Sequence, residues 1–139
     1  MSDLKFRIGI LSTIDNPLLP FFISAITLQG LNDLVVICDS KTISETDKRL
    51  WAERTNGAFD IVDNRATNIY AFPSLPFYFV DSHNSRSTVD LISSLDIRCL
   101  LNAGTLRKLS INILQSVKHG VVNIHTGLLP ESRGCSAVA

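Results

Sequence analysis

The chain has no excess of charge of either sign and no long apolar run, and both absences exclude classes of protein. Its 13 basic residues balance its 13 acidic residues, and without a basic cluster no nucleic-acid partner is expected. The apolar runs are far shorter than the roughly 20 residues that a membrane-spanning helix needs. The start MSDLKFRIGI lacks the early apolar segment of a signal peptide. We therefore expect a cytoplasmic protein without membrane contact.

Cysteine is scarce as well. Cys38, Cys99 and Cys135 are widely spaced and form no Cys-x-x-Cys pair, so neither a disulfide framework nor a metal site is expected. Cys38 and Cys99 lie in apolar runs that are typical of strands, where a free thiol packs as a small apolar group. The sequence thus predicts buried free thiols and no bound metal.

Two glycine motifs that bind nucleotides are missing. A dinucleotide-binding domain carries G-x-G-x-x-G after its first strand, so that the backbone can approach a pyrophosphate. Here that region reads GILSTIDNP, with Gly9 inside the expected strand, and there is no G-x-x-x-x-G-K elsewhere. Both absences argue against a nucleotide-dependent oxidoreductase, which would have to bind its cofactor near GILSTIDN.

The chain does contain an alternation of apolar runs with helix-like segments. Strands are expected over residues 6–11, 34–39, 59–63, 77–81, 97–104 and from 121 onwards. Helices are expected over residues 16–30, 44–57, 85–96 and 106–120. Ser44 and Ser85 are expected to cap the second and third of these, and apolar residues recur at a spacing near 3.6 in the fourth. Because the strands are continuous apolar runs, the sheet should be covered on both faces. At 139 residues the chain suits one domain, so we predict an α/β, Rossmann-like, doubly wound and mostly parallel sheet.

Polar residues follow several expected strands, where sheets of this class bind ligands. Asp39 ends the second strand and could hold a ribose, but without a glycine loop it is more simply explained by capping or solvation. Asp81 and His83 follow a later strand. A solvated histidine is the simpler interpretation there too, with a role in a site as the alternative.

Asn123 and His125 stand out among these strand-end residues. Residues i and i+2 of a strand point to the same side, and Gly127 and Pro130 then turn the chain. An amide beside an imidazole can stabilise an oxyanion and shuttle a proton. The two side chains could equally well only hydrogen-bond the loop backbone. Spacing alone leaves both interpretations open.

The segment NIHTGLLPESRG, residues 123–134, resembles the signature of the folate-dependent formyltransferases. In that family Asn-x-His is followed by a small residue, Leu-Leu-Pro and often Arg-Gly. The segment LLNAGTLRKLS, residues 100–110, also resembles the family's strand, loop and helix that line the pterin pocket. The family includes methionyl-tRNA, glycinamide ribonucleotide and sugar N-formyltransferases. The resemblance implies the formyltransferase fold, with residues 1–139 as the N-terminal part of a single catalytic domain.

The resemblance also implies a reaction of one-carbon metabolism, transfer of a formyl group from 10-formyltetrahydrofolate to an amine. Asn123 would donate a hydrogen bond to the oxyanion, and protonated His125 would stabilise the same charge and assist proton transfer. The implied contacts to the folate come from the backbone around Leu106, Arg107 and Leu109 and from the loop of Gly127, Leu128, Leu129 and Pro130. Judged by pattern alone, Leu106 and Leu109 are equally good core residues of a helix.

Three departures from the family pattern limit what the resemblance implies. The third catalytic residue of the family, an aspartate downstream of the histidine, would fall beyond Ala139. We therefore expect a C-terminally truncated domain with an exposed apolar edge, which a missing C-terminal segment or another chain would complete and which alone could lack activity. The Gly-Asn-Gly-Ser-Asn loop of the glycinamide ribonucleotide enzymes and the Gly-Thr-Pro segment of the methionyl-tRNA enzymes are both replaced by LSTIDNP.

The acceptor therefore stays open. A sugar amine or another small-molecule amine is compatible with the sequence, and so is water, as in formyltetrahydrofolate deformylase. The rival from another class is a non-catalytic α/β binding module that keeps the motif as structure.

Overall fold

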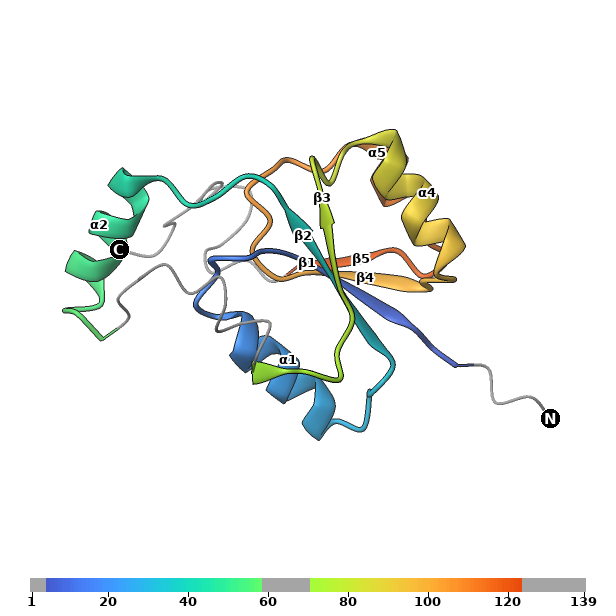
Figure 1. Ribbon diagram of the computed structural model, residues 1–139, viewed down its shortest axis with the longest axis horizontal. Helices are drawn as coiled ribbons and strands as arrows, with labels where there is room; N and C mark the ends of the chain where they lie inside the picture. Colours follow the sequence, from blue (N-terminus) through green and yellow to red (C-terminus); the bar gives the residue numbers. More distant parts are fainter. Residues whose placement is uncertain (1–4, 59–70, 124–139) are drawn as a thin grey trace.

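The computed structural model describes residues 5–58 and 71–123, and within them the chain forms one parallel sheet between helices (Figure 1). The strands are β1 (Ile8–Thr13), β2 (Leu34–Asp39), β3 (Phe77–Val80), β4 (Cys99–Asn102) and β5 (Val121–Asn123). They lie in the order β3-β2-β1-β4-β5, and every neighbouring pair is parallel. This is the predicted Rossmann-like α/β architecture. The order of the strands reverses between β1 and β4, as it does at the switch point of such sheets.

The two central strands are buried on both faces, which explains why they read as continuous apolar runs. Ile10 of β1 and Val36 of β2 are register partners and belong to one core, which includes Ile23 of helix α1 (Leu19–Leu28). The next pair along, Leu11 and Ile37, points to the opposite core. Alternate residues of each central strand thus supply two separate cores.

Helices cover the two faces of the sheet unequally. Helix α1 lies on one face, whereas α4 (Arg86–Ser94) and the short α5 (Ile111–Leu114) lie on the other (Figure 1). Helix α2 (Glu45–Arg54) buries no residue.

The predicted serine caps are confirmed: Ser44 Oγ accepts from the N–H of residue 47 at 3.1 Å, and Ser85 Oγ from that of residue 88 at 3.2 Å. Each satisfies a free backbone donor of a first helical turn.

The expectation of one helix over residues 106–120 is wrong. The helix is limited to Ile111–Leu114, and an irregular segment precedes it. In that segment Asn84 Nδ2 donates to Lys108 O at 2.9 Å, and Asn84 Oδ1 accepts from Ser110 N at 2.8 Å. These contacts replace intrahelical hydrogen bonds, so an apolar spacing near 3.6 did not make a helix. The expected strand over residues 59–63 lies outside the described residues.

Apolar side chains remain exposed along both edges of the sheet. Phe79 of β3 is 60% exposed and Val122 of β5 is 51% exposed. Cys38 is a buried free thiol, as predicted, whereas the free thiol Cys99 is only half-buried. Cys135 lies outside the described residues. None of the helices in residues 5–58 and 71–123 is long and apolar enough to span a bilayer.

Candidate active site

Asn123 ends β5, where its side chain meets that of Asn102 at the end of β4. The two residues are register partners in adjacent parallel strands, so their side chains leave the sheet on the same face. Asn102 Nδ2 donates to Asn123 Oδ1 at 2.8 Å. Asn102 Oδ1 accepts from the backbone N–H groups of Thr105 at 3.0 Å and Gly104 at 3.3 Å. Asn123 is itself exposed, so its amide can reach a ligand.

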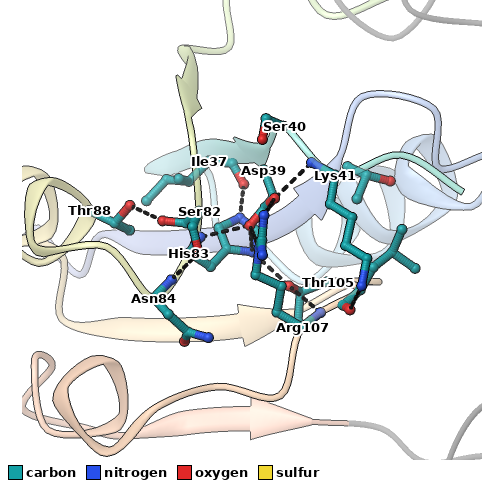
Figure 2. Close-up of polar contacts among 12 residues, drawn as sticks. Ile37, Asp39, Ser40, Lys41, Ser82, His83, Asn84, Thr88, Thr105 and Arg107 are labelled. Atoms are coloured by element: carbon teal, nitrogen blue, oxygen red, sulfur yellow. Dashed lines mark hydrogen bonds and ion pairs between the residues drawn. The ribbon is translucent and has the colours of Figure 1, made fainter.

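A buried carboxylate, Asp39, lies at the end of β2 and gathers four donors (Figure 2). Arg107 Nε is 2.6 Å from Oδ2 and Arg107 Nη2 is 2.9 Å from Oδ1. The backbone N–H of Lys41 donates to Oδ1 at 2.8 Å, and that of His83 to Oδ2 at 2.7 Å. Burial raises the pKa of the Asp39 carboxyl, but these hydrogen bonds outweigh it and hold the pKa below its usual value. Asp39 is thus an ionised anchor for three loops.

His83 is fully buried beneath this carboxylate. Its Nε2 is 2.8 Å from Ile37 O, and its Nδ1 is 2.7 Å from Thr105 Oγ1 (Figure 2). Because a carbonyl oxygen can only accept, we assign the proton to Nε2. Burial lowers the pKa of His83, against the opposing effects of Ile37 O and the Asp39 charge. A neutral ring then accepts from the Thr105 hydroxyl at Nδ1.

The simpler interpretations of Asp39 and His83 from the sequence were therefore wrong. Neither side chain is solvated: Asp39 is 2% exposed and His83 is 0% exposed. Asp39 caps no helix either: its carboxylate accepts from two loop N–H groups, and the helices that follow are capped by Ser44 and Ser85. Sequence reasoning could not identify Arg107 as its partner, since the two residues are 68 positions apart.

The segment expected to line a pterin pocket lies beside this network. The guanidinium of Arg107 is committed to Asp39, and Leu106 O accepts from Lys41 Nζ at 3.2 Å. Leu109 packs against the core on the face of the sheet that α4 and α5 cover, so it has a structural role in that core.

A second polar cluster, which the sequence analysis did not identify, joins the ends of β1 and β4. Asn16 Nδ2 donates to Ala103 O at 2.6 Å and to Ser12 Oγ at 3.0 Å. Ser12 Oγ in turn donates to Ala103 O at 2.8 Å. These contacts fix the loop after β1 against the end of β4. The polar run STIDN was its only signal in the sequence.

The other residues implied by the resemblance are His125, Gly127, Leu128, Leu129 and Pro130. They all lie outside the described residues. No group of three or more His, Cys, Asp or Glu side chains placed to hold a metal ion occurs in residues 5–58 and 71–123.

Comparison with known proteins addresses the family. No family model matches the chain. The methionyl-tRNA formyltransferase of Listeria innocua serovar 6a is 34% identical over 64 residues, and that of Listeria monocytogenes serotype 4a is 32% identical over 65 residues. Part of this chain is thus similar in sequence to methionyl-tRNA formyltransferases. The matched segments cover 46% and 47% of the chain and only 20% and 21% of these formyltransferases, so the match spans about a fifth of their length.

Solved formyltransferase structures share the fold. Glycinamide ribonucleotide transformylase 1 from Symbiobacterium toebii superposes with a TM-score of 0.54 at 19% identity, over 95% of this chain and 57% of that one. Phosphoribosylglycinamide formyltransferase from Bacillus halodurans gives a TM-score of 0.58 at 17% identity, over 94% and 61%. At these identities the likeness establishes a formyltransferase-like fold and nothing about the acceptor.

Proposed function

We propose that this chain is part of a cytoplasmic enzyme that transfers a formyl group from 10-formyltetrahydrofolate to an amine. The observation that carries the proposal is the position of Asn123, an exposed amide at the carboxyl end of β5, hydrogen-bonded to the strand that leads into the Leu106–Leu109 segment. Ligands of open parallel sheets bind at this end of the strands. The relationship to the formyltransferases gives the reaction class.

The residues of the chain would divide the work between them. The acceptor nitrogen adds to the formyl carbon of the folate, and the formyl oxygen becomes an oxyanion. The bond from that carbon to the folate nitrogen breaks when the oxyanion collapses, which leaves the formyl group on the acceptor. Asn123 donates a hydrogen bond to the formyl oxygen while it gains negative charge. Protonated His125 places a positive charge beside the same oxygen and gives its proton to the leaving folate nitrogen, and the neutral imidazole then takes the proton that the acceptor nitrogen releases. One such oxyanion donor typically contributes about 3–4 kcal/mol to the transition state.

The folate would lie against the backbone of Leu106, Arg107 and Leu109 and the loop of residues 127–130. Two observations are compatible with that placement. Arg107 is turned onto Asp39, so its side chain does not occupy the space beside the segment's backbone. Leu109 packs into the core and holds the segment against the sheet. The carboxylate that would orient His125 is proposed to come from another segment or another chain.

We propose a small-molecule amine without a phosphate, such as a sugar amine, as the acceptor. The loop after β1 holds Asp15, whose carboxylate is buried and accepts from Ile43 N at 2.9 Å through Oδ2. Asp15 Oδ1 is buried without a hydrogen-bond partner. This buried carboxylate disfavours an anion bound beside the loop.

The test is a spectroscopic assay of 10-formyltetrahydrofolate turnover by the complete protein, with a panel of amines and with no amine. Asn123→Ala should lower kcat by about 10²–10³-fold, and His125→Ala should abolish turnover. Asn32→Ala, at an exposed loop asparagine, is the matched control and should leave kcat unchanged. Full turnover by the His125→Ala protein would exclude this mechanism.

A non-catalytic α/β binding module is the second candidate, because the hydrogen bond between Asn102 and Asn123 also gives Asn123 a structural use. That candidate predicts no turnover with any amine or with water, and a loss of stability in Asn123→Ala. Measuring the free energy of unfolding of the same variants separates the two. A catalytic Asn123 lowers kcat far more than it changes stability.

A further inference from the structure

We propose that Asn102 is a positioning residue that holds the Asn123 amide with its NH₂ group toward the reacting oxygen. This inference rests on the proposed function, in which Asn123 is the oxyanion donor. An asparagine side chain carries a donor and an acceptor of nearly the same shape. An unrestrained Asn123 could therefore present either group, and only one of them stabilises negative charge.

The orientation of Asn102 is fixed by two backbone groups. The N–H groups of Gly104 and Thr105 both point at one side-chain atom of Asn102, at 3.3 and 3.0 Å. A backbone N–H can only donate, so this atom must be the carbonyl oxygen Oδ1. The other side-chain atom of Asn102 is then the NH₂ nitrogen. The backbone can fold back in this way because Gly104 has φ +98°, a conformation that glycine adopts readily.

The orientation of Asn123 follows from that of Asn102. Asn102 Nδ2 lies 2.8 Å from the facing atom of Asn123, and an NH₂ group needs an acceptor there. That atom is therefore Oδ1, and the NH₂ group of Asn123 points the other way. A reversed Asn123 amide would set two NH₂ groups against each other at this distance. Because Asn123 is exposed, its outward group is accessible to a ligand.

The fold brings these groups together through ordinary strand pairing. Asn102 and Asn123 are register partners, and β4 is held on its other side by β1, with Leu11 opposite Asn102. Nothing in this arrangement requires the ligand to be present. The amide donor is thus set before the substrate binds, which is how preorganised sites stabilise developing charge.

Asn102→Asp is the sharpest test because it keeps the shape and keeps an acceptor for the two N–H groups. It replaces the NH₂ group by a carboxylate oxygen, so Asn123 must turn its own NH₂ toward position 102 and its carbonyl outward. In the complete protein we expect kcat to fall about 10²–10³-fold, the effect of losing one oxyanion donor. The KM for 10-formyltetrahydrofolate should change by less than about threefold, because binding in the ground state does not use this donor.

A double-mutant cycle separates orientation from the effect of added charge. If Asn102 acts through Asn123, Asn102→Asp should change kcat by less than about threefold in an Asn123→Ala background. A charge effect of the new carboxylate would persist in that background. Asn102→Ala adds no charge and should give a smaller loss of kcat. In an Asn123→Ala background, Asn102→Ala should cause no further loss.

Nuclear magnetic resonance of the ¹⁵N-labelled protein provides a readout that does not need catalysis. In the unmodified protein the Asn102 NH₂ hydrogens should exchange slowly and those of Asn123 rapidly. In Asn102→Asp the Asn123 NH₂ group should become the slowly exchanging one. A protected Asn123 NH₂ in the unmodified protein would overturn the proposal. The proposal would also be overturned if Asn102→Asp kept kcat within threefold of normal while Asn123→Ala was impaired. It would equally be overturned if Asn102→Asp lowered kcat by the same factor in the unmodified protein and in the Asn123→Ala background.

If no amine and no water supports turnover, the proposed function fails. The exchange measurement still decides which way the Asn123 amide faces. The two failures are therefore distinguishable.

Discussion

Arg107 and Asp39 face each other across the central strand of the sheet, with β1 between the strands that position them. The Asp39 side chain is fully buried, whereas that of Arg107 is 29% exposed. The pair therefore closes over the carboxyl end of β1 and fastens the loop after β4 to the end of β2. It holds in place the segment that the proposed function assigns to folate binding.

Asp39→Asn should destabilise the protein by about 2–3 kcal/mol, somewhat less than the typical cost of breaking a fully buried pair, because Arg107 is partly hydrated. The free energy of unfolding from urea denaturation measures this. Arg86→Gln is the matched control, since Arg86 and Asp90 form an exposed pair at 3.1 Å, and it should cost under about 0.5 kcal/mol. Equal costs for the two variants would mean that the Asp39 pair adds no stability.

Stability should fall as the pH drops below about 6.5, because His83 is held neutral in the fold. Burial lowers the pKa of His83, so between its folded and unfolded values only the unfolded chain binds the proton. Stability therefore rises with pH there, by up to about 1.4 kcal/mol per pH unit. Asp39 contributes separately: its lowered pKa gives stability that is lost only below about pH 4.

The check is urea denaturation of the protein and of His83→Asn between pH 5 and 7.5. The variant should lose the slope that His83 contributes. His119→Gln, at an exposed histidine, should keep it. An unchanged slope in His83→Asn would contradict a neutral buried ring.

Gly104→Ala should destabilise the fold more than Gly120→Ala, although both glycines have positive φ. A Cβ at Gly104 would lie 2.6 Å from Asn16 Nδ2, whereas one at Gly120 would meet nothing within 4 Å. Both variants bear a conformational cost of about 1–2 kcal/mol, and only the first displaces Asn16 from Ala103 O. Thermal unfolding should show the larger decrease in Tm for Gly104→Ala. Equal decreases would show that Asn16 can move aside freely.

Cys38 should resist alkylation in the folded protein. Burial, with a smaller contribution from Asp15, raises the pKa of this thiol to about 12, and the thiolate is the reactive form. Treatment with iodoacetamide at pH 8, followed by peptide mass spectrometry, should leave Cys38 unlabelled, and labelling should appear in urea. Rapid labelling of Cys38 without denaturant would mean that β2 opens readily.

The central part of the fold could be predicted from the sequence because its apolar runs are unambiguous. β2 was predicted with its exact bounds, and the Ser44 and Ser85 caps were identified from their residue type and position. The helix predicted over residues 106–120 was wrong because apolar periodicity does not reveal a distant side chain that competes for the backbone hydrogen bonds. Here that side chain is Asn84. Local pattern predicts elements well only where no long-range polar contact replaces their hydrogen bonds.

The site was predictable in its position more than in its contacts. The strand-end rule led to Asn123, and the family resemblance gave it a role that no contact in the structure tests. The Asn102 and Arg107 interactions were missed because each depends on strand register, which brings together residues far apart in the chain. The sequence alone does not indicate which distant residues become neighbours in the fold.

Trypsin should cleave within helix α2, because this helix buries no residue and contains basic residues that trypsin recognises. Cleavage there would leave β1 and β2 on one fragment and β3, β4 and β5 on the other. The sheet order β3-β2-β1-β4-β5 places the first pair between strands of the second fragment. The nicked chain should therefore remain one particle, and two separately expressed pieces divided at α2 should reassemble as a split protein.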